Sequence, residues 1–93
     1  MKSIIQENKE CYKCGCTNWL EEHHIFGGAN RKISEKYGLK IYLCHIHHNE
    51  PPEGVHYNKE FMQYLHETGQ RIWQEKYNKT KEDFIREFGK NYL

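Results

Sequence analysis

The sequence predicts a small α+β domain stabilised by zinc, in which a zinc knuckle and a β-hairpin are followed by C-terminal helices. Cysteines and histidines cluster over residues 11–16 and 44–48, with spacings typical of metal ligands. Two short runs of β-forming residues follow the first cluster, and from about Asn58 apolar residues recur with helical spacing. The 93 residues suit one domain, 1–93, with a core over about 11–77 and a last helix over about 80–89.

The composition indicates that something besides apolar burial supports this fold. Only 37% of the residues are hydrophobic and the mean hydropathy is -1.05, so the core is thin and a metal or oligomerisation would help. A formal net charge of +1 excludes a polycation that coats nucleic acid by charge alone. Because no apolar run resembles a signal peptide or a transmembrane span, we expect a cytoplasmic protein without a membrane partner, whose cysteines stay reduced.

The first quarter of the chain predicts a loose leader, a knuckle and a strand. Residues 1–10 are polar, and we expect them to be frayed or loosely packed. Residues 11–16 read as a tight turn, since Gly15 lets backbone amides turn toward the sulfurs. Residues 17–26 are rich in β-forming side chains, and Gly27-Gly28 ends that strand.

The next segments predict a short helix and a second strand. One or two helical turns fit residues 31–37, with Gly38 as a left-handed stop. Residues 39–43, LKIYL, read as a strand that leads straight into Cys44. The pair Pro51-Pro52 marks a loop.

The second half of the chain predicts two helices. The first begins at about Asn58 and carries an apolar stripe, although Gly69 weakens it by about 1 kcal/mol and marks a possible bend. The second begins at Thr80, which forms a capping box with Asp83, and it stops at Gly89. Its expected apolar face consists of Phe84, Ile85 and Phe88.

Two chelating pairs predict a structural zinc site. Cys11-x-x-Cys14 and Cys44-x-x-His47 each approach a metal from their own turn, and four such ligands close a tetrahedral shell. Zinc bound in this way contributes on the order of 10 kcal/mol to the folding of small domains. Cys16 is an alternative to Cys14 but reads better as a spare thiol, and buried cysteines without a metal are the other interpretation.

The order of these elements resembles the HNH endonucleases of the ββα-metal superfamily. The residues that carry the resemblance are His23-His24-Ile25, at the end of the first strand, and the run from Leu43 to Asn49, LCHIHHN. That run is similar to the family signature L-C-x-x-C-H-N, with His47 in place of the fourth zinc-binding cysteine. The resemblance covers residue 11 to about residue 72, and the ending EFGKNYL looks like small phage and prophage proteins of this type.

The resemblance implies a one-metal phosphodiesterase that acts on DNA. His24 matches the general base, and an ordinary histidine pKa suits that task at neutral pH. His23 matches a ligand of the catalytic cation, Mg²⁺ or another divalent ion, and His48 matches the second ligand. His56 competes with His48 because it lies just before the long helix, where the family has its last ligand.

Other residues of the resemblance concern phosphate binding and the orientation of the base. Arg31 and Lys32 are expected to bind DNA phosphates near the site. The family's middle asparagine falls near Leu39, which cannot orient the base as an amide does, and Asn30 is a possible substitute.

Each of these residues also has a plainer interpretation. A histidine pair on a strand is often exposed and inert, and Glu21 and Glu22 read as a solvated edge. The aromatic residues fit a core better than a base-stacking surface, and His66 reads as a surface or packing residue.

Two functions therefore follow from the sequence. The first is a zinc-stabilised, metal-dependent DNA endonuclease, which acts in the bacterial host cytoplasm if it is phage-encoded. The second is a non-catalytic zinc module that binds nucleic acid or a protein partner. The histidines left over after zinc is satisfied favour the first, and the missing asparagine favours the second.

Overall fold

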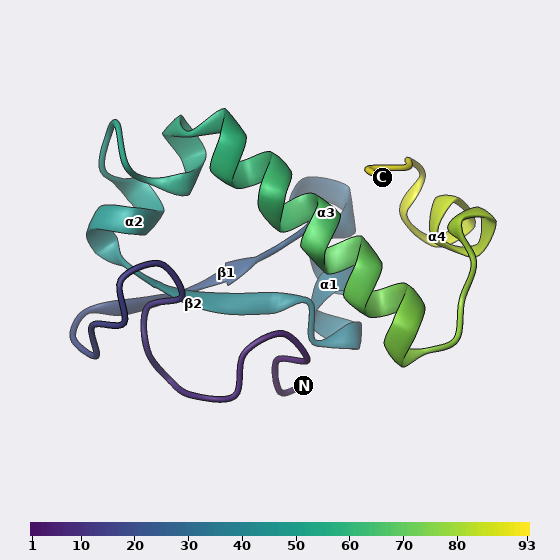
Figure 1. Ribbon diagram of the computed structural model, residues 1–93, viewed down its shortest axis with the longest axis horizontal. Helices are drawn as coiled ribbons and strands as arrows, with labels where there is room; N and C mark the ends of the chain where they lie inside the picture. Colours follow the sequence, from purple (N-terminus) through teal and green to yellow (C-terminus); the bar gives the residue numbers. More distant parts are fainter.

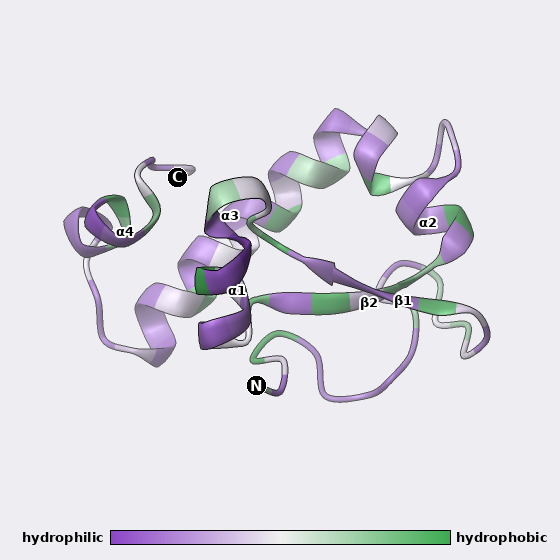
Figure 2. Ribbon diagram, turned by 180° about the vertical axis from the view of Figure 1, so that it is seen from behind, coloured by the Kyte–Doolittle hydropathy of each residue, from purple (hydrophilic) through white to green (hydrophobic).

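A two-stranded antiparallel sheet and a long helix that crosses it form the centre of the molecule (Figure 1). The computed structural model describes all 93 residues and confirms the α+β class. In chain order the elements are β1 (Leu20–His24), the 3-10 turn η1 (Gly28–Asn30), α1 (Arg31–Tyr37), β2 (Lys40–Cys44), α2 (His45–Asn49), the 3-10 turn η2 (Val55–Tyr57), α3 (Lys59–Lys76) and α4 (Lys81–Phe88). Figures 1 and 2 show α2 and α4 at opposite ends of the molecule.

The register of the sheet separates the two adjacent histidines. His23 lies opposite Ile41 and His24 lies opposite Lys40. Since successive side chains of a strand point to opposite faces, His23 shares a face with the buried Ile41, whereas His24 shares the other face with Lys40. The two adjacent histidines at the end of β1 therefore lie in different environments.

Both strands differ slightly from the prediction. β1 has five residues, because Trp19 before it has a left-handed φ of 59° and the residues after it leave the sheet to enter the core. β2 begins and ends one residue later than LKIYL, so that Cys44 is its last residue. The strand order and pairing nevertheless agree with a hairpin-like arrangement.

The N-terminal segment is not frayed, contrary to the prediction. It runs along β2, where the Ser3 hydroxyl donates to the Lys40 carbonyl over 2.5 Å. The backbone amide of Ile4 donates to the Gly38 carbonyl over 2.9 Å, and Gln6 Oε1 accepts from the Tyr42 amide over 2.8 Å. Hydrogen bonds from this segment thus pair backbone groups along the edge of β2 where a third strand would otherwise bind.

The helices begin and end largely where the sequence predicts. Gly38 ends α1 with φ 72°, and Asn58 caps α3 by accepting from the Phe61 amide over 3.1 Å. Thr80 and Asp83 form the expected capping box of α4. The short helix α2 was not expected. It begins directly after Cys44, so one helical turn separates Cys44 from His47, the other ligand of its pair. No helix of the chain is both long enough and apolar enough to cross a membrane.

The core lies between the sheet, α3 and α4. Figure 2 shows α3 as alternating hydrophilic and hydrophobic bands, as expected for a helix with one buried face. Phe84 and Phe88 are buried against Trp73, whereas Ile85, which was predicted to join them, is 39% exposed. α3 continues through Gly69 without a break.

Candidate metal centres

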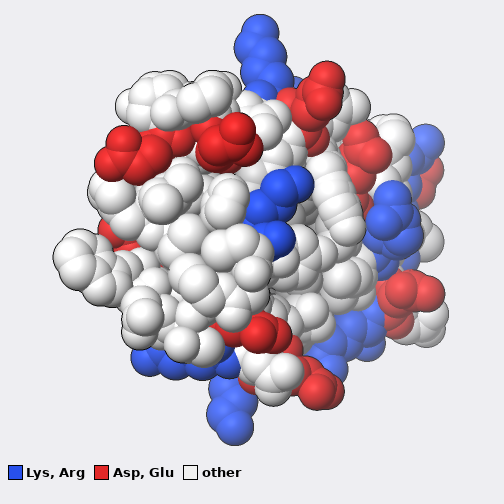
Figure 3. Space-filling view, turned by 60° about the vertical axis from the view of Figure 1, so that its left-hand side comes forward, with Lys and Arg blue, Asp and Glu red and all other residues white.

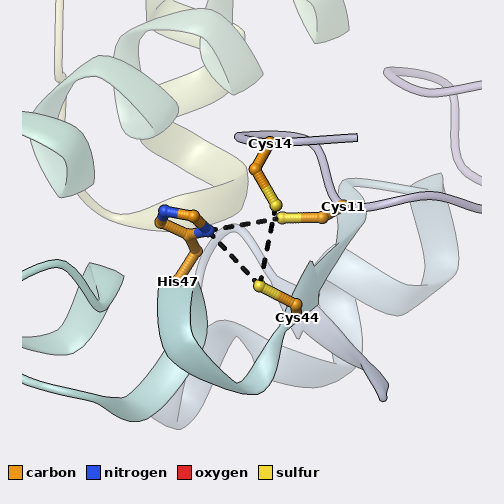
Figure 4. Close-up of side chains that lie close together, drawn as sticks. All are labelled: Cys11, Cys14, Cys44 and His47. Carbon is orange, nitrogen blue, oxygen red and sulfur yellow. Dashed lines mark hydrogen bonds between the residues drawn. The ribbon is translucent and has the colours of Figure 1, made fainter. Parts of the chain in front are cut away.

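Three cysteines and one histidine converge at the end of the sheet that carries α2. Their ligand atoms all lie within 4.8 Å of one another, and the four residues are Cys11, Cys14, Cys44 and His47 (Figure 4). The Sγ atoms of Cys14 and Cys44 are 3.9 Å apart, too far for a disulfide, and all four cysteines of the chain are free. His47 Nδ1 lies 3.8 Å from the Cys11 sulfur and 3.3 Å from the Cys44 sulfur.

These separations fit a tetrahedral zinc ion. Bonds of about 2.3 Å to sulfur and about 2.0–2.1 Å to nitrogen, at tetrahedral angles, bring neighbouring ligand atoms to about 3.4–3.8 Å. The thiol of Cys11 also suits a metal, because backbone amides of Cys44 and Cys14 outweigh the effect of burial and lower its pKa to about 6. The cluster can therefore hold a metal ion such as zinc.

Cys16 does not belong to this group. Its thiol donates to the Asn18 carbonyl over 3.7 Å, and its own carbonyl accepts from the Cys11 amide over 2.8 Å. Cys16 thus closes the knuckle through its backbone, and Cys14 supplies the thiolate in the cluster.

A second cluster consists of three histidines from three different elements. His23 of β1, His48 of α2 and His56 of η2 have ring nitrogens within 4.8 Å of one another. The Nε2 atoms of His48 and His56 are 3.2 Å apart. Both histidines that competed for one ligand position in the sequence therefore lie beside His23.

The environment of His23 fits a metal ligand. Its side chain is buried, with 5% of the residue exposed, and its Nε2 atom has no hydrogen-bond partner. Burial, reinforced by repulsion from His48 and His56, lowers its pKa to about 3, so the ring is neutral. A neutral imidazole with a buried, unpaired nitrogen is costly to fold unless something binds that nitrogen, and a cation between the three rings would do so.

Glu21 orients His48 from behind. Its Oε1 atom accepts from His48 Nδ1 over 2.7 Å and from Asn49 Nδ2 over 2.7 Å. Its Oε2 atom accepts from His45 Nδ1 over 3.0 Å. With the proton of His48 on Nδ1, its Nε2 lone pair faces the cluster, as in carboxylate–histidine–metal arrangements. Glu21 was interpreted as a solvated edge, and its side chain is 37% exposed, but its carboxylate also binds His48, Asn49 and His45.

His24 has a carboxylate partner of its own on the other face. Its Nε2 lies 2.8 Å from Glu35 Oε1 of α1, and its side chain is 7% exposed. Lys40 Nζ donates to the same carboxylate over 2.9 Å. The bonds from His24 and Lys40 lower the pKa of Glu35 to about 2, so the carboxylate stays ionised. When His24 Nε2 donates to Glu35, its Nδ1 is free to accept a proton.

Asn30, the expected substitute for an orienting amide, does not contact His24. Leu39 is completely buried in the core, and the Asn30 amide donates to the Phe88 carbonyl over 2.9 Å. Glu35, which we did not predict as a site residue, contacts His24. Glu35 comes one helical turn after Arg31, and nothing in local spacing links it to His24.

One open cleft brings both histidines of β1 together with a cation. The cleft has a volume of about 510 Å³ and is lined by His23, His24, His48, His56 and Arg31, among others. Lys32 is exposed but does not line it. The structure thus places Arg31, but not Lys32, beside the histidines.

The remaining aromatic residues divide between core and surface. His66 stacks on Phe26 with 5.3 Å between ring centroids, which fits a packing role. Tyr37 packs against Trp73, as expected for a core residue. Trp19 was also expected in the core, but it is 84% exposed.

Comparisons with protein-family models, with curated proteins and with solved structures found no match for this chain. The chemistry of the two clusters therefore comes from their geometry. One cluster supplies four ligands with sulfur in the majority, and the other supplies three imidazoles beside a carboxylate-bound histidine.

Proposed function

We propose that the chain is a metal-dependent DNA endonuclease of the ββα-metal (HNH) type, with zinc bound at Cys11, Cys14, Cys44 and His47 for stability. The observation that carries this proposal is the buried, unpartnered Nε2 of His23, which lies beside His48 and His56 in a cleft that also contains His24. A structural zinc protein needs one ligand set, and the second set serves no evident structural purpose.

His23, His48 and His56 hold a divalent cation in this proposal. The cation would stabilise negative charge on the scissile phosphate and on the leaving oxygen. Because the three ligands are imidazoles without a carboxylate, they suit zinc, nickel or iron better than Mg²⁺, which prefers oxygen ligands. Among the divalent ions that the sequence leaves open, we therefore favour a transition metal.

His24 acts as the general base. Its Nδ1 accepts a proton from the attacking water, and the imidazolium that forms is stabilised by Glu35, 2.8 Å from Nε2. Glu35 replaces the orienting amide that Leu39 cannot supply. Lys40 in turn holds the carboxylate in place.

Arg31 is the cation that binds a phosphate at the cleft. Figure 3 shows acidic and basic groups interspersed over the end of the molecule that carries α2, with uncharged surface between them and no continuous basic face. Affinity for DNA must then come from local contacts, as the net charge of +1 also requires.

The proposal is tested by incubating the purified zinc-loaded protein with single-stranded, duplex and branched DNA and Mn²⁺, Ni²⁺ or Mg²⁺. We expect His24→Ala to lower the cleavage rate by about 10²–10⁴-fold. His45→Ala, which changes an exposed histidine outside the cleft, serves as the matched control. If the wild type cuts no DNA, or if His24→Ala cuts equally well, the non-catalytic zinc module is the better description.

A further inference from the structure

A second hollow continues from the histidine cleft toward the C-terminus. It has a volume of about 610 Å³ and lies between η2, the first turns of α3 and the residues after α4. Three residues line both hollows, namely His56, Met62 and His66. The two hollows are therefore adjacent parts of one groove, with the three-histidine cluster near their junction.

The second hollow carries uncompensated positive charge. Lys59 and Lys90 line it, and no aspartate or glutamate does. Neither lysine is within 4.0 Å of any carboxylate, although Lys36, Lys40 and Arg86 all form ion pairs. Arg31, which lines the first hollow, is also without an ion pair. Three cations without ion pairs thus line one groove, and its one lining carboxylate, Glu22, is paired with Lys40 over 3.5 Å.

An exposed aromatic ring also lines the second hollow. Tyr57 lines the second hollow, is 61% exposed, and follows the cluster residue His56 directly. Lys59 follows two residues later. Flat rings beside unpaired cations are the means by which proteins hold unpaired nucleic-acid bases and their phosphates.

We propose that this second hollow binds an unpaired DNA segment next to the scissile phosphate, with Lys59 and Lys90 on its phosphates and Tyr57 stacked on a base. The proposal builds on the proposed nuclease function and names its substrate class: DNA with a single-stranded stretch beside the cut. A base inside a duplex is already stacked on both faces, so a perfect duplex does not use Tyr57.

Binding in the absence of cleavage tests this proposal. Zinc-loaded His24→Ala protein, with all 93 residues, is titrated with a fluorescent single strand of about 20 nucleotides and with the matching duplex at several salt concentrations. Adding Lys59→Gln and Lys90→Gln should weaken binding of the single strand about tenfold. The slope of log K against log salt should fall by about 1.4, since each phosphate contact on a single strand contributes about 0.7. Tyr57→Ala should weaken single-strand binding several-fold and leave duplex binding unchanged.

The matched control is Lys79→Gln with Lys81→Gln, which removes the same charge from two exposed lysines outside both hollows. Equal effects of the two lysine pairs, no single-strand binding at all, or equal loss of duplex binding in Tyr57→Ala would each overturn the proposal. Single-strand binding that depends on Lys59 and Lys90, in a wild type that never cuts, would refute the nuclease and leave the binding site standing. Normal cleavage kinetics for the Lys59 and Lys90 variants would refute the proposed binding site and leave the nuclease proposal standing.

Discussion

The two ligand clusters lie at neighbouring points of one sheet but differ in how they are closed. The cysteine cluster has four ligands on two chelating pairs, and two of its members, Cys11 and Cys44, are buried in the core. The histidine cluster has three ligands on three separate elements and opens onto a cleft. None of the four ligands of the cysteine cluster lines that cleft.

This difference fits the proposed division of labour between a structural and a catalytic metal. Zinc sites that stabilise a fold use four protein ligands, whereas catalytic sites leave a coordination position for water or substrate. In the proposed catalytic site the three histidines would leave such a position, and the nearby His24 has its own carboxylate partner in Glu35. Removing a ligand from each cluster should therefore have different consequences, which the following variants measure.

The largest expected effect is that of Cys44→Ala. Loss of this buried ligand should release the zinc, which contributes on the order of 10 kcal/mol to folding in small domains, and should leave the chain unfolded. Circular dichroism and the zinc content per chain measure the two effects. Cys16→Ala is the control and should keep both, since its sulfur lies outside the cluster. A Cys44→Ala protein that folds without zinc would show that the cysteine cluster is not needed for folding, and this would contradict the proposed difference between the two clusters.

His48→Ala should remove the second metal without removing the first. We expect the affinity for Ni²⁺ to fall by more than about 100-fold, while one zinc per chain and the circular dichroism spectrum remain. Calorimetric titration of Ni²⁺ into zinc-loaded protein measures this affinity. His45→Ala is the matched control, because His45 shares the Glu21 carboxylate but lies outside the cluster. Similar losses for both variants would show that Ni²⁺ does not bind at the three histidines.

Glu21→Gln should have a smaller effect on the same affinity. The amide oxygen can still accept from His48 Nδ1, but the negative charge that strengthens this bond is lost, so we expect a decrease of about tenfold. Glu22→Gln changes the next residue, which lines the histidine cleft but pairs with Lys40 and His24 and not with His48, and it should leave Ni²⁺ binding unchanged. If Glu22→Gln weakens the metal as much, a general loss of charge explains the result better than orientation of His48.

The sequence predicts those parts of the two sites whose residues lie close together along the chain. The cysteine cluster follows from two short C-x-x-C/H pairs, each of which fixes its own geometry. Glu21 could also have been found, because period-two alternation puts it on the same face of β1 as His23. Glu35 could not, since its contact with His24 depends on how α1 folds back on the sheet.

The fold shows the same limit. Local signals such as Gly38, Asn58 and the capping box at Thr80 set the ends of the helices correctly. The predicted looseness of residues 1–10 was wrong, because polar side chains there satisfy the free edge of β2, and composition alone carries no sign of that pairing. The sequence left open whether His48 or His56 is the ligand. The packing of η2 against α2 places both histidines beside His23, and local spacing does not predict that packing.

The smallest expected effect concerns the segment that joins the two histidines of β1 to the core. A Cβ atom at Gly69 would lie 2.8 Å from Ile25 Cγ2, one residue after His24, and 3.3 Å from the Phe26 ring. Alanine favours a helix by about 1 kcal/mol over glycine, but such crowding costs about 1–3 kcal/mol, so Gly69→Ala should lower the free energy of unfolding by about 1 kcal/mol. Urea denaturation measures it.

Gly27→Ala is the control for this variant, since its Cβ would meet nothing within 4 Å, and it should not destabilise the protein. Zinc content should stay the same in both variants, because the crowding lies away from the four zinc ligands. Cleavage by Gly69→Ala should fall, because a shift of Ile25 moves His24 relative to the three-histidine cluster. Full cleavage activity in a destabilised Gly69→Ala protein would mean that α1 and Glu35, and not α3, fix the position of the base.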